Sequence, residues 1–228
     1  MTQSQFTRGV LAMMPLSLIV LPWGFLTGAL ALDAGIESID ALLMSVMVFA
    51  GAAQLVAIGM IKSDAGVLAI LVTTVFITAR HLLYSASLRT RVMSRPLKWR
   101  LTLGFLLTDE LFAVVGMKSE RDFDPYFSLG AGLCFYLAWV LSTLGGILFS
   151  ANVPNIEALG LEFAVAAIFI AMVMPNVQRS AVAACVLTAL VASAIFHALN
   201  VPGAIVWASL LAMCSGYFVD RLRGTAHE

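Results

Sequence analysis

The chain consists of long apolar runs separated by short polar breaks. Most of the runs approach the roughly 20 apolar residues that a helix needs to cross about 30 Å of hydrocarbon. The breaks contain charges or turn-forming residues, such as Lys62-Ser63-Asp64 and Asn152-Val153-Pro154-Asn155. The pattern predicts about eight membrane segments, at residues 9–32, 40–61, 65–88, 101–117, 125–149, 157–175, 180–198 and 202–219.

Helices are expected in all of these segments, because only helices and closed barrels satisfy every backbone polar group in lipid. The alternating polarity of barrel strands is missing from the sequence. The composition agrees, with 61% hydrophobic and 11% charged residues, whereas soluble domains carry about 25% charged residues. The sequence therefore predicts an all-α polytopic membrane protein, with residues 1–228 forming a single transmembrane helical domain.

Two features of the apolar runs suggest departures from plain crossings. Pro15 and Pro22 lie within segment 9–32, and a proline inside a helix removes a backbone donor and clashes with the preceding turn. We expect this helix to be broken at Pro22-Trp23-Gly24. A weak internal repeat is also suggested, because "SIDALL" at Ser38 and "NIEALG" at Asn155 open two apolar runs in similar ways.

The basic residues predict which side of the membrane one loop occupies. Residues 89–100 contain five basic residues and no acid, so the positive-inside rule makes this loop cytoplasmic. Eight full crossings counted from it place both termini outside, whereas Arg221 and Arg223 favour the inside. We therefore expect one crossing in each half to be a hairpin or a broken segment, and 9–32 is the candidate in the first half.

Charged residues inside the apolar segments are the candidate functional groups. Arg80 lies nine residues before Arg89, and Asp109 lies nine residues after Arg100. Each is therefore about 13–14 Å from the basic loop, near the bilayer midplane. If segments 65–88 and 101–117 form an antiparallel hairpin, Arg80 meets Asp109 and Glu110. The pairing is expected because an unpaired charge at that depth costs about 2.5–3.5 kcal/mol.

This cluster has the chemistry to bind an amino-acid zwitterion. Arg80 is the candidate for the substrate carboxylate, and Asp109 or Glu110 for its ammonium group. Asp109, Glu110 and His81 are candidate carriers of a coupling proton.

Two further polar residues belong to the predicted substrate site. Tyr84 lies four residues after Arg80, on the same helix face. Gln54 interrupts segment 40–61, and either an interhelical hydrogen bond or a ligand contact explains it. The alternative for the cluster as a whole is a purely structural ion pair between two helices.

Other classes of function find no support in the sequence. The formal net charge is zero, so no nucleic-acid partner is expected. Cys134, Cys185 and Cys214 lie within apolar runs without metal-ligand spacing. No Walker A, haem, zinc or nucleophile-elbow motif is present. We therefore expect no cofactor, no metal and no enzymatic activity.

Four stretches resemble the AzlC-type family, the large subunit of bacterial branched-chain amino-acid exporters: "PLSLIVLPWGF", "FAGAAQLVAIGM", "ITARHLLYSASLRTRV" and "GFLLTDELFAV". The resemblance implies export of valine, leucine and isoleucine, and sometimes methionine, through the bacterial cytoplasmic membrane. It also implies a small membrane partner of the AzlD type. Together with the midspan charges, it predicts a secondary transporter, coupled to protons. The alternative is a channel-like or scaffold membrane subunit in which the Arg80–Asp109 pair is purely structural.

Overall fold

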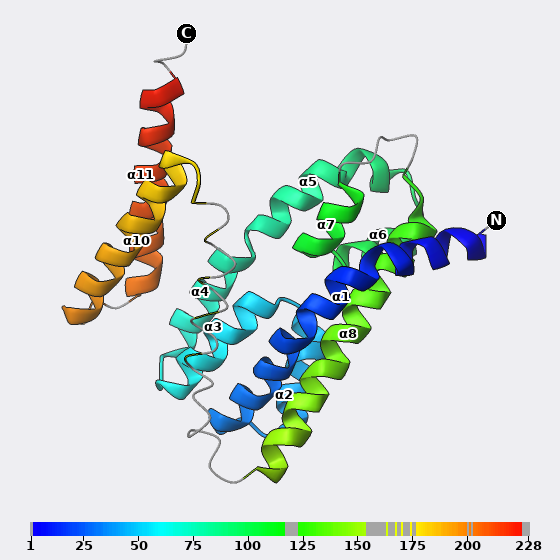
Figure 1. The fold of residues 1–228 in the computed structure, drawn as a ribbon, viewed down its shortest axis with the longest axis horizontal. Helices are drawn as coiled ribbons and strands as arrows, with labels where there is room; N and C mark the ends of the chain where they lie inside the picture. The colour runs from blue at the N-terminus through cyan, green and yellow to red at the C-terminus, as the bar shows by residue number, and fades with distance from the viewer. Residues whose placement is uncertain are drawn as a thin grey trace. The chain divides into compact units, whose positions relative to one another are not determined.

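In the computed structural model of the chain, the described residues are 2–116, 123–153, 177–199, 201 and 203–224, together with residues 163, 167, 170 and 174. They form helices and no strand, which confirms the predicted all-α class. The chain divides into two compact units, the second formed by residues 71–76 and 160–228. The helices are α1 (Thr2–Asp33), α2 (Ser38–Val48), α3 (Gly51–Lys62), α4 (Val67–Thr78), α5 (Arg80–Met93), α6 (Leu97–Phe105), α7 (Asp109–Val115), α8 (Pro125–Asn152), α10 (Ser180–Ala198) and α11 (Ala204–Gly224) (Figure 1).

Five helical stretches of the described chain are long and apolar enough to cross a membrane: Ser4–Asp33, Val67–Met93, Pro125–Asn152, Ser180–Ala198 and Ala204–Leu222. The second of these stretches contains α4 and α5, which are separated at Ala79. Most of the predicted segment 157–175, and with it the second copy of the suggested repeat, lies outside the described residues.

The predicted break in the first segment is wrong, because α1 continues through Pro15 and Pro22 as one helix of 32 residues. The hydroxyl of Thr27 donates a hydrogen bond of 2.8 Å to the carbonyl of Trp23, just after the second proline. In addition, α1 lies alongside α8 over most of its length (Figure 1). This tertiary contact supports the helix beyond the two prolines, where an isolated helix would end.

Close contact between α1 and α8 depends on small residues. The two helices run parallel, with Phe6 next to Gly130 and Phe25 next to Gly146. At Gly28 and Gly146 the backbone of one helix touches the backbone of the other, so that an added Cβ would overlap a carbonyl oxygen. Small residues at such positions let membrane helices approach closely and gain van der Waals contact.

Residues 38–62 form a hairpin of two short helices instead of the single crossing predicted for 40–61. Lys62 at the end of α3 makes an ion pair of 2.8 Å with Asp33 at the end of α1. Because α2 begins at Ser38, five residues after Asp33, both arms of the hairpin end on the same side of the unit. Phe49, at the turn between the arms, has a left-handed backbone with φ of 41°.

A second hairpin replaces the crossing predicted for 101–117. Arg91 near the end of α5 donates hydrogen bonds to the carbonyls of Val115 and Gly116 at the end of α7. Trp99 in α6 contacts Tyr126 in α8, with ring centroids 4.9 Å apart. The start of α6 and the end of α7 therefore lie at the same end of the unit. The arms contain nine and seven residues, about 13 and 10 Å, which is too short to cross a bilayer.

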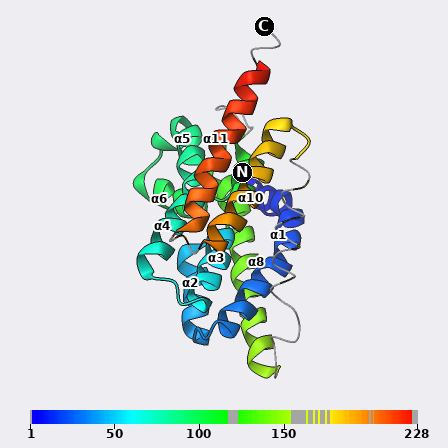
Figure 2. The same ribbon diagram turned by 90° about the vertical axis from the view of Figure 1, so that its left-hand side faces the viewer.

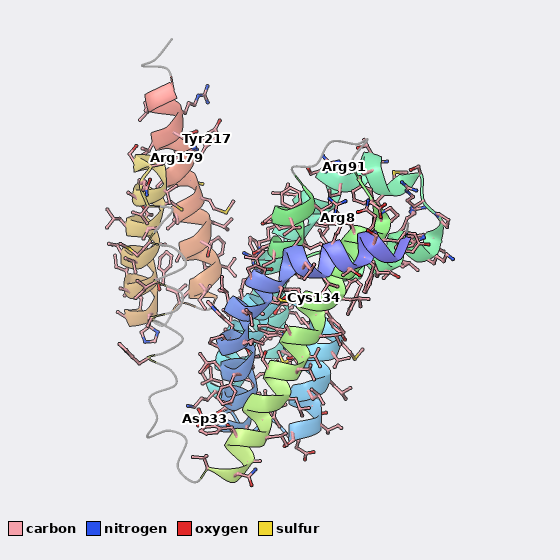
Figure 3. The ribbon with its side chains drawn as sticks, turned by 45° about the vertical axis from the view of Figure 1, so that its right-hand side comes forward. Arg8, Asp33, Arg91, Cys134, Arg179 and Tyr217 are labelled. Atoms are coloured by element: carbon pink, nitrogen blue, oxygen red, sulfur yellow. The ribbon has the colours of Figure 1, made fainter. Side chains whose placement is uncertain are left out.

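The hairpins enter the first unit from opposite ends, since Asp33 and Arg91 lie at opposite ends of it (Figure 3). Their turns meet between those ends. The ring of Phe49 lies 6.2 Å from that of Phe105, the last residue of α6. Tyr136 of α8 contacts both rings, and its hydroxyl donates to the carbonyl of Val46 in the last turn of α2. The expectation of a hairpin in the first half holds, but the location predicted for it does not.

The two hairpins also bear on the orientation of the chain. Arg8 lies at the same end of the first unit as Arg91 and the basic loop (Figure 3). Asp33 and Lys62, with the acidic residues Glu37 and Asp40 close by in sequence, lie at the other end. With α1, α4–α5 and α8 as the crossings of this part, the beginning of α1 lies on the side of the basic loop, in agreement with the positive-inside rule.

The second unit contains the helix pair α10 and α11, which run side by side (Figures 1 and 2). An added Cβ at Gly216 of α11 would lie 3.2 Å from the Cβ of Cys185 in α10. The hydroxyl of Ser215 donates to the carbonyl of Ala184 across the same contact, at 3.3 Å. Small residues therefore hold this pair together as well.

Candidate functional site

An ion pair joins the two charges that the sequence places deepest in the apolar segments. The Nη1 atom of Arg80 lies 2.8 Å from Oδ2 of Asp109. Arg80 is the first residue of α5 and Asp109 is the first residue of α7, so both charges lie where a helix starts after an interruption. The Nε atom of Arg80 and Oδ1 of Asp109 are buried without a hydrogen-bond partner. The pair therefore leaves one donor and one acceptor unpaired between α5 and α7 in the described part of the chain.

The expected arrangement of the two segments differs in one respect. Arg80 meets the first residue of α7 and Arg91 meets its last two carbonyls. Helices α5 and α7 therefore run parallel, and the predicted antiparallel packing is wrong for them. The depth of the two charges still matches, because α6 enters from the basic loop and α7 returns towards it. The prediction that Asp109 lies at the same depth as Arg80 is therefore confirmed. The assumption of one helix running from the basic loop through Asp109 is wrong, because α6 ends at Phe105 and α7 begins at Asp109.

The start of α7 is specified by its own sequence. Thr108 is the N-cap residue, and its hydroxyl oxygen accepts a hydrogen bond from the backbone N–H of Leu111 at 3.3 Å. Asp109 and Glu110 occupy the first turn, where negative charge is favourable. Glu110 is half-buried and lies beside Thr108. Within the described chain it makes no ion pair, so Asp109 and not Glu110 is the partner of Arg80.

Aromatic residues surround the ion pair. The ring of Tyr84 stacks on that of Phe112, with centroids 4.5 Å apart and an interplanar angle of 17°. The ring of His81 lies 6.1 Å from that of Tyr84. Tyr84 is also close enough to Asp109 for an electrostatic interaction. The predicted residues Arg80, His81, Tyr84 and Asp109 thus form one cluster between α5 and α7.

Gln54 belongs to a different cluster. It is 1% exposed, and its Nε2 donates to Ser45 at 2.9 Å while its Oε1 accepts from Trp139 Nε1 at 3.2 Å. The network closes through Thr143, whose hydroxyl accepts from Ser45 and donates to the carbonyl of Trp139. Helices α2, α3 and α8 are joined by these bonds. In the described part of the chain, no hydrogen bond or ion pair connects Gln54 to the Arg80 cluster.

Three residues that organise the first unit were not identified from the sequence. Arg91 was counted among the charges of the basic loop, but its Nη1 donates to the carbonyls of Val115 at 3.3 Å and Gly116 at 2.9 Å. Nothing in the local sequence indicates the hydrogen bond of Trp139, because its partner Gln54 lies 85 residues away. Phe49 lies within the apolar segment 40–61, and nothing in its local sequence indicates a left-handed conformation, which phenylalanine rarely adopts.

The described residues contain no group of three His, Cys, Asp or Glu side chains able to hold a metal ion. The arrangement instead offers one cation and two carboxylates at two helix starts, lined by aromatic rings. Such a set can bind a small zwitterion through both of its charges.

Comparisons with known proteins place the chain in a family. The model of the family described as "AzlC protein" matches residues 15–153, which include both hairpins and the ion pair. The chain is 31% identical over 213 residues to an uncharacterized membrane protein of Archaeoglobus fulgidus, covering 92% of each chain. It is 28% identical to the inner membrane protein YgaZ of Escherichia coli, over 82% of this chain and 78% of that protein.

One of the relatives is named for a function. The chain is 30% identical to the branched-chain amino acid transport protein AzlC of Bacillus subtilis, over 64% of this chain and 58% of that protein. No solved structure matches the chain significantly. The relatives and the apolar helices together identify a multi-pass membrane protein.

Proposed function

Because this chain belongs to the AzlC family, we propose that it is a secondary transporter that exports branched-chain amino acids across the cytoplasmic membrane, coupled to protons. The name of the Bacillus subtilis relative supports the transport of branched-chain amino acids. The observation that carries the proposal is the Arg80–Asp109 ion pair at two helix starts inside the apolar part of the protein. Ionisable groups at such positions commonly mark a substrate or ion pathway.

When substrate binds, Arg80 and Asp109 separate, and each pairs with an oppositely charged group of the substrate. The Arg80 guanidinium can engage both oxygens of a substrate carboxylate, and its partnerless Nε supplies an additional donor. The Asp109 carboxylate accepts from the substrate ammonium group, again with a partnerless oxygen. Two charge-assisted contacts then replace one internal pair, so opening the pair leaves neither Arg80 nor Asp109 without a charged partner.

The apolar side chain of the substrate has a surface to bind. Phe112 stacks on Tyr84 directly beside the ion pair. A leucine, isoleucine or valine side chain gains by displacing water from these rings, while its charged groups stay on Arg80 and Asp109. Gln54 contributes from a distance, by fixing α3 against α8 through its hydrogen bonds.

Proton coupling is assigned to Glu110, with His81 as the second carrier. Glu110 is half-buried and is adjacent in sequence to the carboxylate that binds substrate, but Arg80 is not its ion-pair partner. Uptake of a proton removes the charge of Glu110, which changes its electrostatic interactions with Asp109 and Arg80. A switch in charge at the turn between α6 and α7 can therefore bias which side of the membrane the site faces.

Flux into or out of liposomes tests the proposal. The chain, reconstituted with its AzlD-type partner where it needs one, is assayed with radiolabelled leucine at several concentrations and imposed pH gradients. Arg80→Gln and Asp109→Asn should each lower apparent affinity by roughly 10- to 150-fold, the value of one charged hydrogen bond of about 1.5–3 kcal/mol. Glu110→Gln should preserve leucine exchange but remove its response to the pH gradient.

A matched control separates function from structure. Lys62→Gln breaks an ion pair of the same 2.8 Å length at one end of the unit, away from Arg80, and it should leave flux almost unchanged. If Arg80→Gln and Asp109→Asn lower stability as Lys62→Gln does but leave the flux saturable and of normal affinity, the pair is structural and the scaffold alternative is favoured. Flux that never saturates favours a channel.

A further inference from the structure

A cavity of about 330 Å³ lies between α5, α6, α7 and α8, next to the basic loop. Ligand pockets in proteins begin at about 300 Å³, so this cavity has the size of a small binding site. Its wall is mainly aliphatic. The buried residues that line it are Leu88, Leu103, Leu107, Leu111, Val115, Phe123 and Ser128. It is distinct from the Arg80–Asp109 pair, since neither residue lines it.

Two arginines give the cavity a cationic edge. Arg89 and Arg100 line it, and the residues lining it in the described chain include no acid. The Arg89 side chain is directed along α5, where its Nε lies 2.9 Å from the sulfur of Met93. A free amino acid fits this cavity poorly, because its ammonium group would have no carboxylate to bind. A molecule with an anionic group and a long hydrocarbon chain fits both the charge and the wall.

The cavity also opens through apolar side chains. Met93, Leu97 and Leu101 line it and are 50%, 63% and 65% exposed, respectively. In a membrane protein such residues face hydrocarbon. The route into the cavity therefore comes from the bilayer, at the depth where the basic loop meets the lipid headgroups. Basic pockets between membrane helices bind anionic lipid headgroups elsewhere.

We propose that this cavity binds one acyl chain of an anionic glycerophospholipid, with the lipid phosphate held between Arg89 and Arg100. The acyl chain then fills the space between the α6–α7 hairpin and α5. Because α7 carries Asp109 and Glu110 at its start, the lipid supports the hairpin that presents both carboxylates. The binding site itself does not depend on which substrate the protein moves or on whether it moves one.

Two pairs of variants test the headgroup and the chain separately. Arg89→Gln/Arg100→Gln removes the cationic edge, and Arg95→Gln/Lys98→Gln removes the same charge from exposed positions outside the lining. Gly104→Phe fills the cavity from α6, where an added Cβ meets no atom within 4 Å. Gly59→Phe is its control, a helical glycine of α3 with equally open surroundings that does not line the cavity.

The assay is native mass spectrometry of the full-length chain, after exchange into nanodiscs of phosphatidylethanolamine with graded amounts of phosphatidylglycerol. The wild type and both controls should retain one phosphatidylglycerol in preference to phosphatidylethanolamine. The double arginine variant should lose about thirtyfold in affinity, at about 1 kcal/mol for each arginine. Gly104→Phe should lose the retained lipid although its arginines are intact.

Other results overturn the proposal. Equal retention of both lipids, or equal retention by the variants and their controls, would show that no built anionic-lipid site exists. Displacement of the lipid by leucine at millimolar concentration would assign the cavity to the amino acid instead. Displacement by the AzlD-type subunit would assign it to that protein partner.

Discussion

Replacing Gly146 of α8 with alanine tests the close contact between α1 and α8. A Cβ at this position would overlap the carbonyl oxygen of Phe25 and lie 2.8 Å from the carbonyl carbon. These are backbone atoms of α1, so no change of side-chain rotamer relieves the overlap. The two helices must move apart, by an amount on the order of 1 Å, and the contacts along their interface weaken together.

The neighbouring residue supplies the control and the magnitude. A Cβ on Gly145 would meet only the Cδ2 atom of Phe25, at an ordinary distance of 3.7 Å. Both substitutions gain the same helix propensity, about 1 kcal/mol for glycine to alanine. Only Gly146→Ala adds the cost of overpacking, about 1–3 kcal/mol. The free energy of unfolding should therefore be lower for Gly146→Ala than for Gly145→Ala by about 1–3 kcal/mol.

Unfolding in mixed micelles, followed by circular dichroism while the denaturing detergent is increased, measures this difference. The two variants have identical composition, so differences in detergent binding largely cancel. If they unfold at the same midpoint, α1 and α8 do not approach as closely as the structure shows. A Gly145→Ala variant less stable than Gly146→Ala would contradict the register of the two helices.

Two other predictions concern the ends of the hairpins. Arg91→Gln should remove the hydrogen bonds to the last carbonyls of α7, at a cost of about 1.5–3 kcal/mol in stability. Amide hydrogen exchange should then be faster in α7 but not in the middle of α8. Unchanged exchange in α7 would mean that Arg91 does not stabilise this helix. Phe49→Ala and Phe49→Gly both lose the aromatic contacts of Phe49. The glycine variant should nevertheless be more stable to unfolding by about 1–2 kcal/mol, because φ is 41° at this position. An alanine variant more stable than the glycine variant would refute the left-handed turn.

The sequence was sufficient for the class of the protein and for the central pair of charges. Long apolar runs predict membrane helices regardless of how the helices pack, because each span must satisfy its own backbone. Arg80 and Asp109 were predicted to pair because an unpaired charge in lipid is costly, and the structure places them 2.8 Å apart. The start of α7 also follows from local chemistry, since Thr108 and the two acids after it specify a helix N-terminus.

Tertiary structure decided how the apolar runs are used. A crossing and a hairpin of two short helices have the same hydropathy, so the sequence predicts plain crossings for segments 40–61 and 101–117. The difference lies in distant contacts, such as Lys62 with Asp33 and Arg91 with Gly116, which fix where each hairpin ends. Pro22 illustrates the converse, because a local helix-breaking signal was overridden by the packing of α1 on α8.

The partners of polar residues were likewise beyond the sequence. Gln54 could be recognised as unusual in its segment, but its hydrogen bonds to Ser45 and Trp139 depend on α2, α3 and α8 meeting at one place. The physical reason is range. Hydropathy and helix capping depend on residues within a few turns of the chain. Hydrogen bonds and ion pairs between helices depend on residues tens of positions apart, which only the folded structure brings together.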